Sequence, residues 1–177
     1  CFQDGVFQAV YTSATVLPKP VATSRYYHRN INLLKLVDVG FAGVPVDSTK
    51  DAEVEKLALP AEPALPGIRP LGLKDIPDVH RLLCRYLRRF DLALSPTQEE
   101  VQHWLLGTAQ SSADEILYTY VVEDPETHAI TDCVSFFFIE ALVLKHPKYK
   151  SIKVAYLNFY ASEAGLRRKS ADLPERL

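Results

Sequence analysis

The stretch GVFQAVYTSATVLPKPVATSRYYHR, residues 5–29, holds two apolar runs on either side of a Pro-Lys-Pro break. Pro18 and Pro20 have no backbone N–H and a fixed φ, so regular strand pairing must stop between Leu17 and Val21. The pattern therefore predicts a strand, a turn and a second strand.

A cluster of polar aromatic residues ends this second predicted strand. Arg25, Tyr26, Tyr27, His28 and Arg29 bring several hydrogen-bond donors, acceptors and π faces together within five residues. Such a composition is typical of a place where a polar ligand meets an apolar wall. From the residues alone, a histidine that is merely hydrogen-bonded at the surface remains an alternative for His28.

Length and composition indicate an ordinary globular protein. The 177 residues are enough for one domain with a core, and 47% of them are apolar and 24% charged. A net charge of −2 gives no overall basic field, so nucleic acid and anionic membrane are poor candidates for the main partner. The chain has no apolar run near 18 residues and does not open on a secretory leader pattern, so we expect a cytoplasmic protein.

The cysteines and the absence of methionine add two expectations. Cys1, Cys84 and Cys133 are odd in number and far apart, which fits neither a disulfide framework nor a metal site, so we expect reduced thiols and no bound metal. The chain has no Met and opens in the middle of a pattern. It therefore reads as a piece of a longer chain whose natural start is not residue 1.

The remaining pattern predicts an α+β (mixed α/β) fold. Residues 74–90 give the strongest helix, because seven apolar residues fall on one face: Ile76, Val79, Leu82, Leu83, Tyr86, Leu87 and Phe90. A second helix is predicted from the N-cap Ser95 to about Leu106. The other expected elements are a short helix in 31–41, a connecting loop with no more than a helical turn in 42–66, strands at 67–71, 115–122, 130–144 and 152–161, and a helix start at 170–177.

The run QAVYTSATVLPKPVATSRYYHR resembles a segment of the eukaryotic N-myristoyltransferases, written roughly QAxYTAGxVLPxPVxTxRYxHRxLN, and is most similar to the fungal members. Further similar segments follow in the same order over nearly the whole chain: residues 35–41, 67–70, 120–123, 131–132, 135–136 and 155–156. The IRPL strand and the helix after it also resemble the opening unit of GNAT-type acyltransferases, a fold that N-myristoyltransferases contain twice.

The resemblance implies an incomplete GNAT-like fold, with a predominantly antiparallel mixed sheet and flanking helices. Residues 1–30 would end the N-terminal half, and residues 31–177 would form a truncated C-terminal half. It further implies a monomer that transfers myristate from myristoyl-CoA, a co-substrate, to the N-terminal glycine of peptides and proteins. No catalytic residue and no permanently bound cofactor is expected in this chain, because the family's acyl-CoA loop and oxyanion hole lie upstream and its catalytic carboxylate ends the chain downstream.

What the resemblance leaves for this chain is part of a peptide-binding groove. By position, it implies that seven residues line that groove: Thr12, Tyr26, His28, Phe136, Phe137, Ala141 and Tyr156. Three positions depart from the family pattern. Ala14 stands in place of a glycine, whose bare backbone or positive φ the position near the ligand would need. Phe137 stands in place of a tyrosine and Ala141 in place of a serine, and each of these two lost hydrogen bonds is worth about 0.5–1.5 kcal/mol of peptide affinity.

Three functions stay open at this point. The first is the peptide-binding part of an acyltransferase that has no turnover as an isolated chain. The second is a truncated or diverged relative that binds peptides without catalysis. The third, an unrelated acetyl-CoA-dependent GNAT enzyme, predicts a pyrophosphate loop that the sequence does not show.

Overall fold

The computed structural model describes residues 5, 19, 23, 25–63, 65–106 and 116–167. The predicted first strand and the Pro-Lys-Pro turn lie outside the described residues, as do Thr12, Ala14 and the helix start expected at 170–177. Residues 25–30 are described, and they form no strand. The strand prediction is therefore wrong for Arg25 to Arg29, since no described strand lies beside them to complete a ladder of hydrogen bonds.

The described elements run in the order helix, helix, strand, helix, helix, three strands and a last short helix. Their bounds are α1 (Leu33–Asp38), α2 (Lys50–Leu57), β1 (Ile68–Pro70), the 3₁₀ turn η2 (Leu73–Asp75), α3 (Ile76–Leu87), α4 (Gln98–Leu106), β2 (Leu117–Glu123), β3 (Ile130–Leu142), β4 (Ser151–Ser162) and α5 (Glu163–Arg167). The helix predicted within residues 31–41 and all four predicted strands after it are thus confirmed, with small shifts of their ends.

Two local predictions need correction. Helix α4 begins at Gln98 and its cap is Thr97, not Ser95: the Thr97 hydroxyl accepts from the Glu100 N–H, and the Glu100 carboxylate accepts from the Thr97 N–H. This reciprocal pair is a capping box, and it places the N-cap of the helix at Thr97. Helix α2 is two turns long rather than one. It buries no residue, so apolar periodicity could not reveal it, and the Thr49 cap together with the Glu53–Lys56 pair supports it instead.

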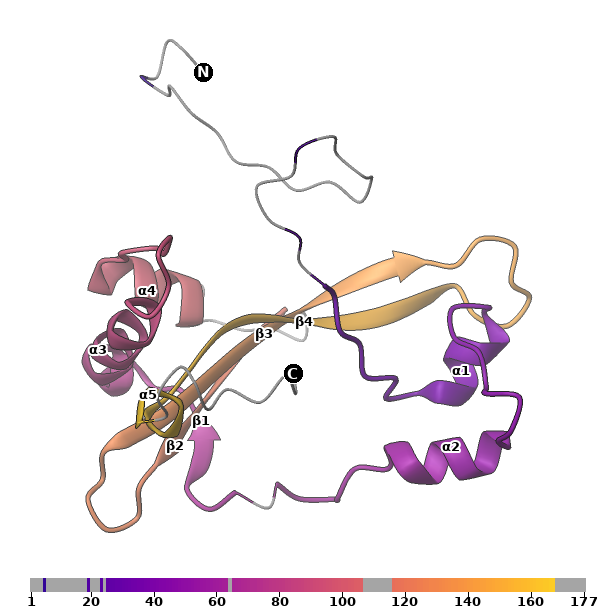
Figure 1. The fold of residues 1–177 in the computed structure, drawn as a ribbon, viewed down its shortest axis with the longest axis horizontal. Coiled ribbons are helices and arrows are strands. Elements are labelled where there is room, and N and C mark those ends of the chain that lie inside the picture. Colours follow the sequence, from indigo (N-terminus) through magenta and orange to yellow (C-terminus); the bar gives the residue numbers. More distant parts are fainter. Residues whose placement is uncertain are drawn as a thin grey trace.

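The four strands form one antiparallel sheet in the order β1-β2-β3-β4. Helices α3 and α4 lie side by side on one face of this sheet, and the ribbon of β3 and β4 extends away from them (Figure 1). The α+β fold with a predominantly antiparallel sheet and flanking helices is therefore confirmed.

The core lies between α3, α4 and the facing side of the sheet. Its buried members come from both helices, from three strands and from Leu71 after β1: Leu71, Ile76, Val79, Leu82, Leu83, Val101, Leu105, Val121, Ile130, Cys133 and Ala161. One polar pair lies among them. The Thr119 hydroxyl donates to the Leu105 carbonyl at 2.7 Å and lies 3.0 Å from the Ser135 hydroxyl, so neither hydroxyl is buried without a partner.

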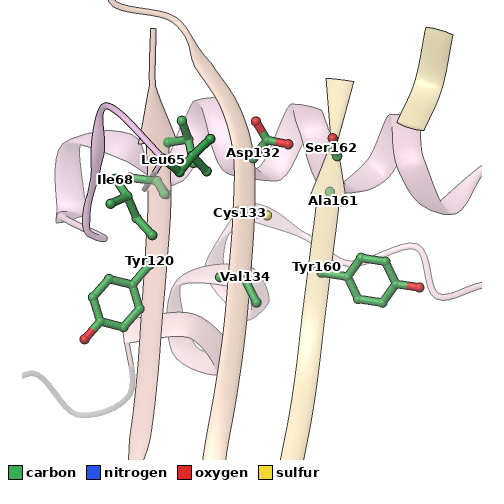
Figure 2. A pocket seen from close by; sticks show the side chains of 11 residues that line it. Leu65, Ile68, Tyr120, Asp132, Cys133, Val134, Tyr160, Ala161 and Ser162 are labelled. Carbon is green, nitrogen blue, oxygen red and sulfur yellow. The ribbon is translucent and has the colours of Figure 1, made fainter. Parts of the chain in front are cut away.

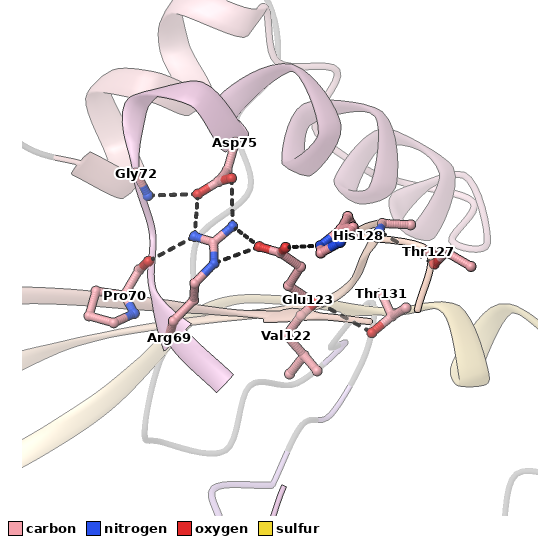
Figure 3. Close-up of polar contacts among 10 residues, drawn as sticks. Arg69, Pro70, Gly72, Asp75, Val122, Glu123, Thr127, His128 and Thr131 are labelled. Carbon is pink, nitrogen blue, oxygen red and sulfur yellow. Dashed lines mark hydrogen bonds and ion pairs between the residues drawn. The ribbon is translucent and has the colours of Figure 1, made fainter. Parts of the chain in front are cut away.

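An ion-pair network ties β1 to the start of α3 (Figure 3). Arg69 donates to both carboxylate oxygens of Asp75 at 2.7 and 2.8 Å and to Glu123 at 2.8 Å. Asp75 also accepts from the Gly72 N–H, and Glu123 lies 2.8 Å from Nδ1 of His128. The hydrogen bonds from Arg69 hold the pKa of Asp75 below its usual range, so this buried carboxylate is charged at neutral pH.

Candidate functional site

The β3–β4 ribbon presents two different faces, and a bulge in β4 sets their register. Phe137 pairs with Tyr156, Ile139 with Val154 and Ala141 with Ile152. Directly paired residues of an antiparallel sheet point to the same side, so these six side chains share one face, which we call the ribbon wall. This is the side of the sheet on which Cys133 and Ser135 face the helices, continued beyond the helices.

The ribbon wall is apolar and partly open to solvent. The Phe137 and Tyr156 rings stack with their centroids 5.8 Å apart and their planes at 17°. Tyr156 remains 44% exposed and Ile139 45%, while Ile152 is buried. The stacked pair and the small Ala141 side chain leave a shallow apolar surface with one hydroxyl, that of Tyr156.

Phe136 lies on the opposite face of the sheet. It stacks on Tyr118 at 5.6 Å and on Tyr120 at 6.2 Å, and it meets Phe138 edge to face at 5.8 Å. We call these four aromatic residues the open aromatic face, because α3 and α4 cover the other side of the sheet. The structure thus separates Phe136 from Phe137, Ala141 and Tyr156, with which the resemblance grouped it.

Tyr26 and His28 lie on the segment before α1, which forms neither helix nor strand. Tyr26 is 79% exposed, and the His28 ring meets Phe41 edge to face at 6.3 Å. Arg29 donates to the Leu57 carbonyl at 3.3 Å, which ties this segment to the end of α2. Of the predicted groove residues, the structure therefore brings Phe137, Ala141 and Tyr156 onto one wall, places Tyr26 and His28 on a separate segment, and leaves Thr12 undescribed.

A pocket of about 240 Å³ lies on the other face of the sheet and was not predicted from the sequence. Ile68, Tyr120, Val134 and Tyr160 line it, and Asp132 and Ser162 stand at one end (Figure 2). The alternation of Tyr118, Tyr120 and Val122 along β2 was a usable signal, since every second residue of a strand shares a face. The pocket does not join the ribbon wall.

Two cysteines lie among the described residues, and they differ in surroundings: Cys84 is half-buried with its Sγ 3.4 Å from Nε2 of His80, and Cys133 is buried. Burial raises the pKa of the Cys133 thiol to about 11, so it stays protonated and unreactive at neutral pH. Within the described ranges, no group of three or more His, Cys, Asp or Glu residues could hold a metal ion. No helix in that same part of the chain is long and apolar enough to span a membrane.

Comparison with known proteins agrees with this architecture. Residues 38–176 match the family model described as Myristoyl-CoA:protein N-myristoyltransferase, C-terminal domain. The whole chain is 46% identical to a glycylpeptide N-tetradecanoyltransferase from Aspergillus fumigatus, and 93% of it is 47% identical to one from Schizosaccharomyces pombe. A crystal structure of Saccharomyces cerevisiae N-myristoyltransferase with bound myristoyl-CoA and inhibitors superimposes on 90% of the chain, with a TM-score of 0.82 and 38% identity.

The matched region is one part of these longer proteins. The chain spans 36% of the Aspergillus relative, 35% of the Schizosaccharomyces relative and 37% of the Saccharomyces structure. Because the family model covers most of the chain, the chain belongs to the myristoyl-CoA:protein N-myristoyltransferase family and carries its C-terminal domain.

Proposed function

We propose that this chain supplies one wall of the peptide groove of a glycylpeptide N-tetradecanoyltransferase, an enzyme that moves myristate from myristoyl-CoA to the N-terminal glycine of a protein. The observation that carries the proposal is the ribbon wall, where Phe137, Ala141 and Tyr156 come together on one exposed apolar face. Peptide binding needs such a surface, with a few polar groups to fix orientation. Tyr156 supplies one hydroxyl there.

In this proposal, Tyr26, His28 and Thr12 belong to the facing side of the groove. Tyr26 and His28 lie outside regular secondary structure and are exposed, so their polar groups are accessible to a peptide backbone. The chain then binds and orients the peptide and performs none of the proton transfer. A carboxylate that takes the proton of the glycine ammonium, and backbone N–H groups that stabilise the oxyanion, would come from the parts of the enzyme that match the remaining length of its relatives.

Myristoyl-CoA is a substrate in this scheme, and its contacts also lie outside the ribbon wall. The proposal therefore predicts that residues 1–177 alone bind a peptide weakly and transfer no acyl group. Measurable myristoyl transfer by this chain alone, followed with radiolabelled myristoyl-CoA, would refute the assignment of the chemistry to other parts.

A second candidate is a diverged relative that binds peptides without catalysis. The observation that favours it is the chemistry of the wall: Phe137 and Ala141 carry no hydroxyl, so fewer groups are available to fix a peptide. The two candidates separate when the chain is extended with its own flanking coding sequence to the length of the relatives. The extended protein transfers myristate in the first case, and it binds peptides without transfer in the second.

The wall itself can be tested by peptide affinity. The Tyr156→Ala variant should weaken binding of a fluorescent octapeptide with N-terminal glycine by about tenfold or more, as expected for loss of an aromatic side chain that the bound peptide covers. Tyr118→Ala is the matched control, because Tyr118 also stacks on a phenylalanine but lies on the open aromatic face. Equal losses in both variants, or none in Tyr156→Ala, would remove the ribbon wall from the proposal.

A further inference from the structure

Residues 142–150, which are the last residue of β3 and the loop that joins it to β4, have features that peptide binding does not use. It lies at the end of the ribbon farthest from α3 and α4, beside α1 (Figure 1). The Val143 N–H donates to the Lys150 carbonyl at 2.8 Å and closes the loop, and Lys145 turns the chain with a φ of 61°. We call these nine residues the hairpin tip.

The hairpin tip exposes two leucines almost completely. Leu142 is 78% exposed and Leu144 is 83% exposed. Leu142 is also on the face opposite Ala141, because neighbouring residues of a strand alternate between faces. The ribbon wall therefore does not use these side chains, and in the part of the chain that the structure describes both are accessible to an apolar phase.

Positive charge surrounds the two leucines. Lys145, Lys148 and Lys150 are exposed within the tip, and the sequence holds no acidic residue between Glu140 and Glu163. Helix α1 adds a fourth ammonium group, because Nζ of Lys35 lies 5.2 Å from the centre of the Tyr149 ring and Nζ of Lys148 lies 4.9 Å from it. Two carboxylates lie near this cluster, since Glu140 accepts from the Ser151 hydroxyl and Asp38 of α1 interacts electrostatically with Lys148. Residues 142–150 themselves hold three lysines and no acidic residue, although the whole chain carries −2.

Internal contacts hold the tip in one conformation. The His146 ring stacks on Tyr149 at 5.3 Å. Its Nδ1 atom accepts hydrogen bonds from the backbone N–H groups of Lys148 and Tyr149 at 3.2 and 3.0 Å. The lysines and leucines are therefore displayed on an ordered loop, which lowers the entropy lost when the loop binds.

We propose that the hairpin tip docks on a membrane surface that carries anionic phospholipids, with Leu142 and Leu144 entering the boundary between headgroups and acyl chains and the lysines contacting the headgroup phosphates. Peripheral membrane binding grows with buried apolar area together with electrostatic attraction, and the tip supplies both. The leucines favour a lipid surface over RNA, because beside a phosphate backbone they would gain no apolar partner. The net charge of −2 made anionic membrane a poor candidate for the main partner of the chain, whereas the membrane contact proposed here involves only the hairpin tip.

The test places a tryptophan at the tip and asks whether it enters the bilayer. The chain with Leu144→Trp is mixed with vesicles of phosphatidylcholine and phosphatidylserine whose acyl chains are brominated, so that a buried indole is quenched. Leu92→Trp is the matched control, because Leu92 is 84% exposed but lies between α3 and α4. The native Trp104 contributes the same background to both variants.

We expect quenching of Leu144→Trp and not of Leu92→Trp, and loss of this quenching with pure phosphatidylcholine or at high salt. Adding Lys148→Glu and Lys150→Glu should weaken vesicle binding by at least about thirtyfold, since each lysine near an anionic surface contributes a factor of about five. The charge-matched control, Lys50→Glu with Arg88→Glu, should change it little. Three results would overturn the proposal. The first is equal quenching at both positions, and the second is no quenching at the tip in a chain whose circular dichroism is native. The third is tight RNA binding that depends on the same lysines, without vesicle binding.

Discussion

Replacement of Arg69 by methionine should destabilise the protein through the carboxylate of Asp75. Asp75 is 5% exposed, and Arg69 supplies two of its three hydrogen bonds. Methionine keeps much of the side-chain volume but donates nothing. The variant therefore leaves a buried carboxylate with only the Gly72 N–H as a partner.

The magnitude follows from the burial of this pair. Removing one partner of a buried ion pair costs about 3–5 kcal/mol. The Arg69 side chain is 29% exposed, so water replaces part of the lost contact, and we expect about 3 kcal/mol. The assay is the free energy of unfolding from urea denaturation. Arg81→Met is the matched control, because the Arg81–Asp78 pair on α3 is exposed and should contribute less than about 1 kcal/mol.

The difference should also depend on pH in one direction. The pKa of Asp75 is lowered in the folded protein, so the carboxylate contributes stability above its unfolded pKa of about 4 and loses it as pH falls through the folded pKa. The gap between wild type and Arg69→Met should therefore be constant from about pH 6 to 8 and shrink below about pH 4. A loss no larger than that of Arg81→Met, or a gap that grows on acidification, would refute the reasoning.

Three further predictions concern the fold. Gly67→Ala should lower the free energy of unfolding by more than about 2 kcal/mol in urea denaturation, because Gly67 has a φ of 76° and a Cβ there would lie 2.0 Å from the Glu123 carbonyl oxygen. Cys133 should resist iodoacetamide in the native state while the half-buried Cys84 reacts, because burial raises the Cys133 pKa to about 11; mass spectrometry before and after unfolding checks this, and equal labelling contradicts it. Thr119→Val should cost about 1–3 kcal/mol by leaving the buried Leu105 carbonyl unpaired, and a loss below about 0.5 kcal/mol in thermal unfolding would show that water replaces the hydroxyl.

Much of the fold follows from local pattern. Helix α3 could be predicted from its apolar periodicity, because the apolar side of the helix is the side that it buries. The β2–β3 hairpin could be predicted from the polar turn at residues 124–128 between two apolar strands. The full length of helix α2 was not predicted, because the helix buries no residue and so has no apolar periodicity. Its Thr49 cap is a weaker signal than an apolar face. The start of α4 was misplaced because the sequence offers two overlapping capping boxes, Ser95 with Gln98 and Thr97 with Glu100, and the structure forms the second.

The candidate site was harder to predict. A family motif groups Phe136 with Phe137, but neighbouring residues of a strand point to opposite faces. The motif alone therefore could not show that Phe137 lies on the ribbon wall and Phe136 on the open aromatic face. The pairing of Phe137 with Tyr156 depends on the extra residue that bulges β4, and this register shift has no local sequence mark. The ion pair between Arg69 and Asp75 was also not predicted, because it depends on how the end of β1 lies beside the start of α3.

The most direct test of the central claim is photo-crosslinking of a bound peptide. An octapeptide with N-terminal glycine and a benzophenone side chain is irradiated with the chain and the adducts are mapped by mass spectrometry. The account predicts adducts on the ribbon wall, at residues 137, 139, 141, 152, 154 and 156, that an unlabelled glycine peptide competes away. Adducts on Tyr118, Tyr120 or Phe138 of the open aromatic face, with none on the ribbon wall, would contradict it.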